Sequence, residues 1–107
     1  MAILHHNVYV IELSPEVLKD NKFISDNLDC DRALPCFYVG VTGLTPEERF
    51  GNHKRGYKHS KIVKQYGMRL VPEIFEQYNP MLYKDAETKE RTLAIELRLK
   101  GHGVWQK

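Results

Sequence analysis

The sequence predicts a small α+β protein in which strands and helices alternate along the chain. Two segments rich in β-branched and aromatic residues, Asn7 to Leu13 and Phe37 to Val41, have the composition of buried strands. Two further segments carry the end signals of helices, one beginning at Pro46 and one running from about Tyr83 to Lys100. With 107 residues, 42% of them apolar, the chain can build one core, so we expect one domain over residues 1–107.

The first strand is expected to be central in its sheet, because the segment from Asn7 to Leu13 is almost continuously apolar. Ser14 and Pro15, which follow it, are typical of the start of a short helix. A long polar connection from Asn21 to Pro35 then leads to the second strand. This length excludes a tight hairpin but leaves an antiparallel pairing of the two strands open.

A glycine turn joins the second strand to the helix that follows. Gly40, inside the strand, indicates a bulge or the close approach of another backbone or a ligand. Thr45 is a candidate N-cap, and Glu48, three residues later, completes the pattern of a capping box. A helix that begins here presents Arg49 and His53, four residues apart, on one face.

The second half of the chain is predicted to hold a divided helix, one strand and a last helix. The helix from Pro46 is expected to end at Gly67, with a break near Gly56. Met68 to Tyr78 is predicted to be a third strand, placed at an edge because it contains Pro72. After the last helix, the segment from Gly103 to Trp105 is predicted to be extended.

Basic residues cluster in one part of the chain, although the net charge is only +2. From Arg49 to Arg69 there are seven lysines or arginines and no acidic residue. A solvated helix face is one explanation, and phosphate contact is the one that we favour. The predicted nucleic-acid-binding residues are Lys54, Arg55, Lys58, Lys61 and Lys64.

One acidic residue of the last helix is predicted to face the core. Successive residues of a helix are rotated by about 100° around its axis, which places Glu90 within a stripe of small and apolar side chains. Glu87 then lies at the edge of the stripe, and Glu96 points away from it. The stripe consists of Ala86, Leu93, Ala94 and Leu97. A carboxylate there needs a partner, which is either a cation such as Arg49 or a metal ion. A carboxylate, an arginine and tyrosines that face one cleft are suited to metal-assisted phosphoryl transfer.

Cys30 and Cys36 have a spacing that fits no common zinc pattern. No basic leader or long apolar run marks the N-terminal sequence, and no segment approaches the length of a membrane span. We therefore expect free thiols, a cytoplasmic location and no membrane partner.

Taken in order, these residues resemble the GIY-YIG nuclease superfamily, and the whole chain is similar to its small stand-alone bacterial or phage-type members. Asn7-Val8-Tyr9 stands at the family's first tripeptide and Tyr38-Val39-Gly40 at the second. Arg49, His53 and Glu90 match the helical arginine, the histidine four residues on and the metal-binding glutamate. The chain departs from the family in two places. Asn7 replaces the first glycine, and His102 or Gln106 stands in the region where many members carry an asparagine.

The resemblance implies a three-stranded antiparallel sheet flanked by helices, in the order β-β-α-β-α. It also implies a DNA endonuclease that hydrolyses phosphodiester bonds with one divalent metal ion, Mg²⁺ or Mn²⁺. The implied catalytic residues are Tyr9, Tyr38, Arg49, His53 and Glu90. Glu90 would hold the metal and Arg49 the scissile phosphate, and Tyr9 would act as general base or position the nucleophile. Without the resemblance, the favoured interpretation of Tyr9 is a core tyrosine whose hydroxyl is satisfied.

Two other classes of protein fit the same residues. The chain could keep the fold and the basic helix yet cleave weakly or not at all, as a nucleic-acid-binding module. It could also be a protein-interaction domain without affinity for DNA. Within the nuclease hypothesis, the substrate is DNA, and branched, nicked and single-stranded forms all stay open.

Overall fold

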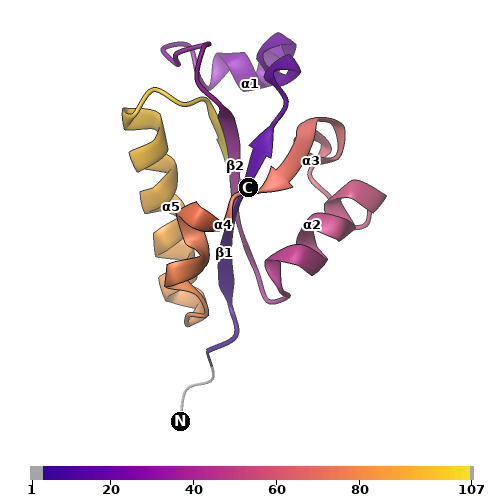
Figure 1. The fold of residues 1–107 in the computed structure, drawn as a ribbon, viewed down its shortest axis with the longest axis vertical. Coiled ribbons are helices and arrows are strands. Elements are labelled where there is room, and N and C mark those ends of the chain that lie inside the picture. The colour runs from indigo at the N-terminus through magenta and orange to yellow at the C-terminus, as the bar shows by residue number, and fades with distance from the viewer. Residues whose placement is uncertain (1–3, 107) are drawn as a thin grey trace.

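The computed structural model describes residues 4–106 and combines one sheet with helices on both of its faces (Figure 1). The strands are β1 (Asn7–Leu13), β2 (Cys36–Thr42), β3 (Gly67–Leu70) and β4 (Val104–Gln106). The α-helices are α1 (Asn21–Ser25), α2 (Pro46–Arg55), α3 (Lys61–Tyr66), α4 (Pro72–Phe75) and α5 (Tyr83–Leu99). Two short 3₁₀ helices, η1 (Pro15–Lys19) and η2 (Glu76–Tyr78), complete the elements. The predicted α+β class is confirmed.

The sheet has four strands in the order β3-β1-β2-β4. The β1 strand pairs antiparallel with β2 and β3, and β4 pairs parallel with β2. The expected three-stranded antiparallel sheet is therefore wrong, because the extended segment after α5 is a fourth, parallel strand. In Figure 1, α5 runs along the sheet against the direction of β2, so the chain that follows it turns back beside β2 in the same direction.

The third strand is much shorter than predicted. It covers Gly67–Leu70, and Pro72 is the first residue of the α4 helix, not an edge residue of a longer strand. Proline lacks an N–H group and has φ preset for the first helical turn, so it favours a helix start here. Gly56, in contrast, ends α2 in the left-handed conformation (φ 83°), which confirms the predicted break. The second piece, α3, ends at Gly67 as predicted, but this glycine has an extended conformation with φ −64° and already belongs to β3.

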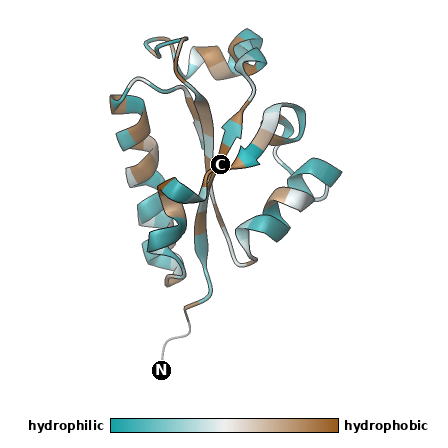
Figure 2. Cartoon of the chain, in the orientation of Figure 1, coloured by the Kyte–Doolittle hydropathy of each residue, from teal (hydrophilic) through white to brown (hydrophobic). Residues whose placement is uncertain are grey.

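The two faces of the sheet carry different helices: α2 and α3 lie on one face, and α4 and α5 lie on the other (Figure 1). Apolar residues are concentrated in the strands, while α2 and the N-terminal half of α5 are largely hydrophilic (Figure 2). The C-terminal half of α5 also carries two exposed apolar residues, Ile95 and Leu99. On α5 the predicted apolar stripe is buried, Glu90 is half-buried beside it, and Glu96 is exposed. The helix register predicted from the sequence is therefore confirmed.

Within the part of the chain that the structure describes, no helix is both long enough and apolar enough to cross a membrane.

Candidate active site

The site begins at the antiparallel pair of β1 and β2, where Tyr9 lies directly opposite Gly40. A Cβ atom added at Gly40 would lie 2.7 Å from both Cζ and Oη of Tyr9. The glycine therefore leaves the space that the Tyr9 ring fills. The register between the strands is continuous, so the predicted bulge is wrong. A close approach is present, but the approaching groups are side chains, chiefly that of Tyr9 on the neighbouring strand, and not the backbone or ligand that the sequence suggested.

The capping box at the start of α2 fixes the residues that this helix presents to the sheet. Thr45 Oγ1 accepts the backbone N–H of Glu48 at 3.1 Å, and Glu48 Oε1 accepts the N–H of Thr45 at 3.3 Å. Asn7 Nδ2 donates to the carbonyl of Leu44 at 2.9 Å. The residue that replaces the family's first glycine thus ties β1 to the turn before α2.

Tyr9, Tyr38 and His53 form a buried cluster of three rings. The ring centroids are 6.0 Å apart for the two tyrosines, 6.1 Å for Tyr9 and His53, and 5.5 Å for Tyr38 and His53. Tyr9 and Tyr38 each expose 1% of their surface, and His53 exposes 0%. The structure therefore brings together three of the five predicted catalytic residues, in the interior between β1, β2 and α2.

Hydrogen bonds determine which nitrogen of His53 carries the proton. The backbone N–H of Ser60 donates to His53 Nδ1 at 3.0 Å, so Nδ1 must be the unprotonated nitrogen. In the neutral ring the proton is then on Nε2, which lies 2.8 Å from Tyr9 Oη. His53 therefore donates to the Tyr9 oxygen and leaves the Tyr9 hydroxyl proton available for a further hydrogen bond.

Burial raises the pKa values of both tyrosines above their ordinary value near 10. For Tyr9, the neighbouring Tyr38 raises the pKa further, while Arg49 lowers it. For Tyr38, hydrogen bonding with Tyr9 and the charge of Arg49 lower the pKa, and the charge of Glu90 raises it. An arginine from α2 and a carboxylate from α5 therefore act on the same tyrosine.

Part of the β2 strand forms an uncovered edge of the sheet. The β4 strand pairs with Phe37 to Val39 of β2, and no strand within residues 4–106 pairs with Gly40 to Thr42 on that side. Next to this edge, Val41, Tyr83, Glu87 and Glu90 line a hollow of about 410 Å³. Tyr83 is exposed, and hydrogen bonding to Glu87 raises its pKa, with smaller effects from the charges of Glu87 and Glu90.

The carboxylates of the hollow fit a magnesium or manganese ion. Mg²⁺ keeps several water ligands and is commonly held by one or two carboxylates together with substrate phosphates. Glu87 and Glu90, three residues apart on α5, supply two. Within residues 4–106, no group of three or more His, Cys, Asp or Glu side chains could hold a metal, so the chain offers no closed, all-protein cage. The sequence analysis placed Glu87 only at the edge of the apolar stripe, and the structure places it beside Glu90 in the lining of this hollow.

The predicted nucleic-acid-binding residues divide into two groups. Lys54 Nζ donates to the carbonyls of Lys64 and Gly67, at 3.1 and 2.9 Å, and thereby ties α2 to the end of α3. Arg55 donates to the side chain of Asn52. All five residues are exposed, and the side chains of the other three lie around α3 and the connection before it: Lys58, Lys61 and Lys64. Arg49 is half-buried and donates through Nη2 to the carbonyl of Lys58 at 2.8 Å, which links this connection to the site.

Neither candidate for the family's asparagine faces the ring cluster. His102 Nδ1 lies 2.7 Å from the carbonyl oxygen of Pro35. Gln106 Oε1 accepts from Arg98 Nη1 at 2.9 Å. Both side chains therefore help to hold the end of α5 and the strand β4 in place.

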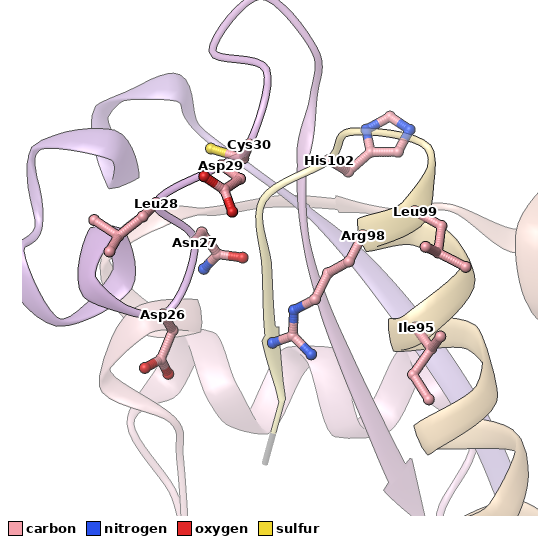
Figure 3. Close-up of a pocket in the computed structure, with 9 residues that line it drawn as sticks. All are labelled: Asp26, Asn27, Leu28, Asp29, Cys30, Ile95, Arg98, Leu99 and His102. Carbon is pink, nitrogen blue, oxygen red and sulfur yellow. The ribbon is translucent and has the colours of Figure 1, made fainter.

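A separate hollow of about 340 Å³ lies between α5 and the connection that follows α1. Figure 3 shows the residues that line it. Arg98 extends into it from α5 and donates through Nη2 to the carbonyl of Val104 at 3.0 Å. Since the arginine is used to hold β4, this hollow is not a candidate for the catalytic centre.

A scan against models of protein families, a search of curated proteins and a search of solved structures each found no match for this chain. The likeness to the GIY-YIG nucleases therefore depends on the residues of this chain alone.

Proposed function

We propose that the protein is a divalent-metal-dependent endonuclease that hydrolyses phosphodiester bonds in DNA. The main support is the environment of Tyr38, whose pKa is raised by burial, lowered by the charge of Arg49 and raised by that of Glu90. An arginine and a carboxylate thus both act on one tyrosine, which lies in the ring cluster with a second. Phosphodiester hydrolysis uses such a set, because negative charge develops on phosphate oxygens while protons move to and from oxygen atoms.

In this proposal Arg49 binds the scissile phosphate and stabilises the charge that develops on its oxygens. Glu90, together with Glu87, would hold Mg²⁺ or Mn²⁺, which when bound polarises the phosphate and lowers the pKa of water. The half-buried position of Arg49 suits this role, because its guanidinium is anchored by the Lys58 carbonyl.

The proton balance assigns roles to the tyrosines. A water oxygen forms the new bond to phosphorus, the ester bond breaks, the water loses a proton, and the leaving oxygen gains one. Tyr9 can accept the water proton only in its ionised form, which burial opposes. The Nε2–H group of His53 and the charge of Arg49 favour that ionised form. A bound divalent metal ion would add positive charge that further favours the ionised form, and Tyr9 would then serve as the base; otherwise it positions the nucleophile, while Tyr38 orients water or phosphate.

One observation favours a second function, that of a DNA-binding module with weak or no cleavage. Tyr9 and Tyr38 expose 1% each, so a DNA phosphate would meet Arg49 and Glu90 before it reached either hydroxyl. A chain of this kind would keep its affinity for DNA and fail to cleave with any divalent metal.

A plasmid-nicking assay with Mn²⁺ or Mg²⁺, and with EDTA as the metal-free control, separates the two functions. Nicking by the wild type that requires metal supports the endonuclease. In that case Glu90→Gln is expected to retain DNA binding but lose cleavage, whereas Glu96→Gln, an exposed carboxylate on the same helix, serves as the matched control and retains both. DNA binding by a folded wild type without nicking in either metal would establish the second function. If Glu96→Gln were inactive and Glu90→Gln active, the proposed metal site would be wrong.

The proposed compartment is the cytoplasm. Cys30 and Cys36 are both free thiols, and Cys36 is buried. Thiols of this kind stay reduced in the cytoplasm.

A further inference from the structure

A second functional feature lies beside the basic residues of α3, where Trp105 borders a hollow of about 510 Å³. This volume lies within the usual range of pockets for small molecules, about 300–1,000 Å³, and it accommodates a nucleobase. Lys22, Lys61 and Asp20 also border the hollow, so an aromatic residue, two basic residues and one acidic residue share its lining.

Trp105 lies on the same face of the sheet as the ring cluster. In the parallel pair of β2 and β4, Trp105 is the partner of Tyr38, and paired residues of adjacent strands project to the same side. The indole packs against Phe23, with ring centroids 6.3 Å apart and ring planes inclined by 26°. Its neighbour Val104 is fully buried, whereas Trp105 remains partly exposed. The tryptophan therefore has both a packed side and a side that is open to the hollow.

The charge around the hollow suits a phosphate backbone. Lys61 borders it and also borders an adjoining hollow of about 380 Å³ that includes Lys64. The nearby carboxylate of Asp20 accepts the backbone N–H groups of Lys22 and Phe23 at 3.0 and 3.1 Å, so it caps the α1 helix. Exposed lysines thus continue from Trp105 along α3.

One residue connects this hollow to the candidate active site. Ser60 borders the hollow, and its backbone N–H is the donor that fixes the protonation of His53. His53 in turn contacts the hydroxyl of Tyr9. DNA bound at Trp105 therefore lies next to the segment that orients the ring cluster.

We propose that an unpaired base of single-stranded DNA stacks on Trp105 in this hollow, while the strand's phosphates contact Lys61 and Lys64. Stacking on an aromatic side chain requires an exposed base face, which a continuous duplex does not offer. The inference rests on the proposed function and gives it a substrate class, namely DNA with a single-stranded segment such as a flap or an open branch.

The test uses the intrinsic fluorescence of the chain, because Trp105 is its single tryptophan. The full chain is titrated in EDTA, which prevents metal-dependent cleavage, with oligothymidylate, with an abasic oligonucleotide of equal length and with a blunt duplex. Binding is followed in parallel by the anisotropy of labelled DNA. Oligothymidylate is expected to quench the emission, while the abasic strand binds to the lysines without quenching. Equal quenching by the two single strands would overturn the proposal.

Variants supply the second part of the test. Trp105→Leu is expected to lower the affinity for oligothymidylate about tenfold, and Trp105→Phe, which keeps a stacking ring, to retain most of it. The matched control is Tyr78→Leu, because Tyr78 is also a partly buried aromatic residue but lies against Lys89 of α5. A folded Trp105→Leu variant with wild-type affinity would overturn the proposal. If Trp105→Leu fails to fold, the comparison of quenching by the two single strands in the wild type decides the question.

The outcomes also separate this inference from the proposed nuclease function. Base-dependent quenching in a chain that does not nick DNA would uphold the Trp105 site and refute the endonuclease. Metal-dependent nicking together with quenching that does not depend on bases would uphold the endonuclease and refute the Trp105 site.

Discussion

Replacing Gly40 by alanine tests the packing of the ring cluster directly. The added methyl group would lie 2.7 Å from Cζ and Oη of Tyr9 and 3.0 Å from Cε1 of Tyr38. Ordinary van der Waals contacts of carbon atoms are about 3.5–4.0 Å. The Tyr9 ring cannot turn aside easily, because it is buried and its oxygen is hydrogen-bonded to His53. Gly40→Ala is therefore expected to displace the ring of Tyr9 and to separate it from His53.

The cost in the free energy of unfolding has three parts. Overpacking a filled core costs about 2 kcal/mol, and loss of the hydrogen bond between Tyr9 and His53 costs about 1 kcal/mol. Removing a glycine from a strand offsets about 0.5–1 kcal/mol of this, because the unfolded chain becomes less flexible. The net loss is about 2 kcal/mol, which lowers the Tm of a domain of this size by about 10 °C.

Thermal unfolding followed by circular dichroism measures this change, and the chain provides a matched control. A Cβ atom added at Gly51 in α2 meets nothing within 4 Å, so Gly51→Ala is expected to raise the Tm slightly. In a Tyr9→Leu background, which lacks both clashing atoms of the ring, Gly40→Ala should cost much less than in the wild type. Equal Tm values for Gly40→Ala and Gly51→Ala would refute the reasoning about the packing of Tyr9.

Three further predictions concern charge and pH. Arg49→Ala should lower the rate of nicking at least about 100-fold with a small change in Tm. Arg49→Lys should recover little of this rate, because a lysine cannot reproduce the planar fork of donors. Normal nicking by Arg49→Ala would make Arg49 a structural residue. Because burial raises the pKa of Tyr9, the unfolded chain ionises first, so stability should be complete below about pH 10 and fall above it. Denaturant unfolding from pH 8 to 11 should show a flatter profile for Tyr9→Phe, but not for the exposed Tyr57→Phe. Lys61→Ala should lower the salt dependence of duplex binding by an amount that corresponds to about one phosphate contact. Lys54→Ala should mainly lower the Tm, because Lys54 holds two carbonyl groups. If anisotropy titrations showed a lower salt dependence for Lys54→Ala and not for Lys61→Ala, the division of the basic residues would be wrong.

Local signals in the sequence predicted the elements that carry the site. The capping box of Thr45 and Glu48 is present, and it sets the phase of α2. Because that phase is fixed, the four-residue spacing of Arg49 and His53 places both residues towards the site. The bounds of the last helix were also predicted to within one residue, because the spacing of its apolar residues shows where it runs and Gly101 shows where it ends.

Non-local pairing was not accessible from the sequence. The segment of β4 is short and was predicted only to be extended. Its residues do not indicate that it pairs with β2 in parallel. The long third strand failed for a local reason, because Pro72 fits both an edge strand and the first turn of a helix. The partners of Lys54 could not be predicted either, since its contacts with two carbonyl groups depend on how α2 packs on α3.

The position of the site follows from the length of β4. This strand covers β2 only as far as Val39, and beyond that point the edge at Gly40 to Thr42 lies uncovered within residues 4–106. The helices α2 and α5 lie on opposite faces of the sheet (Figure 1). Arg49 of α2 and Glu90 of α5 carry opposite charges, and both affect the pKa of Tyr38. The β4 strand also places Trp105 beside Tyr38, so it both limits the candidate active site and carries the ring that we propose binds an unpaired base.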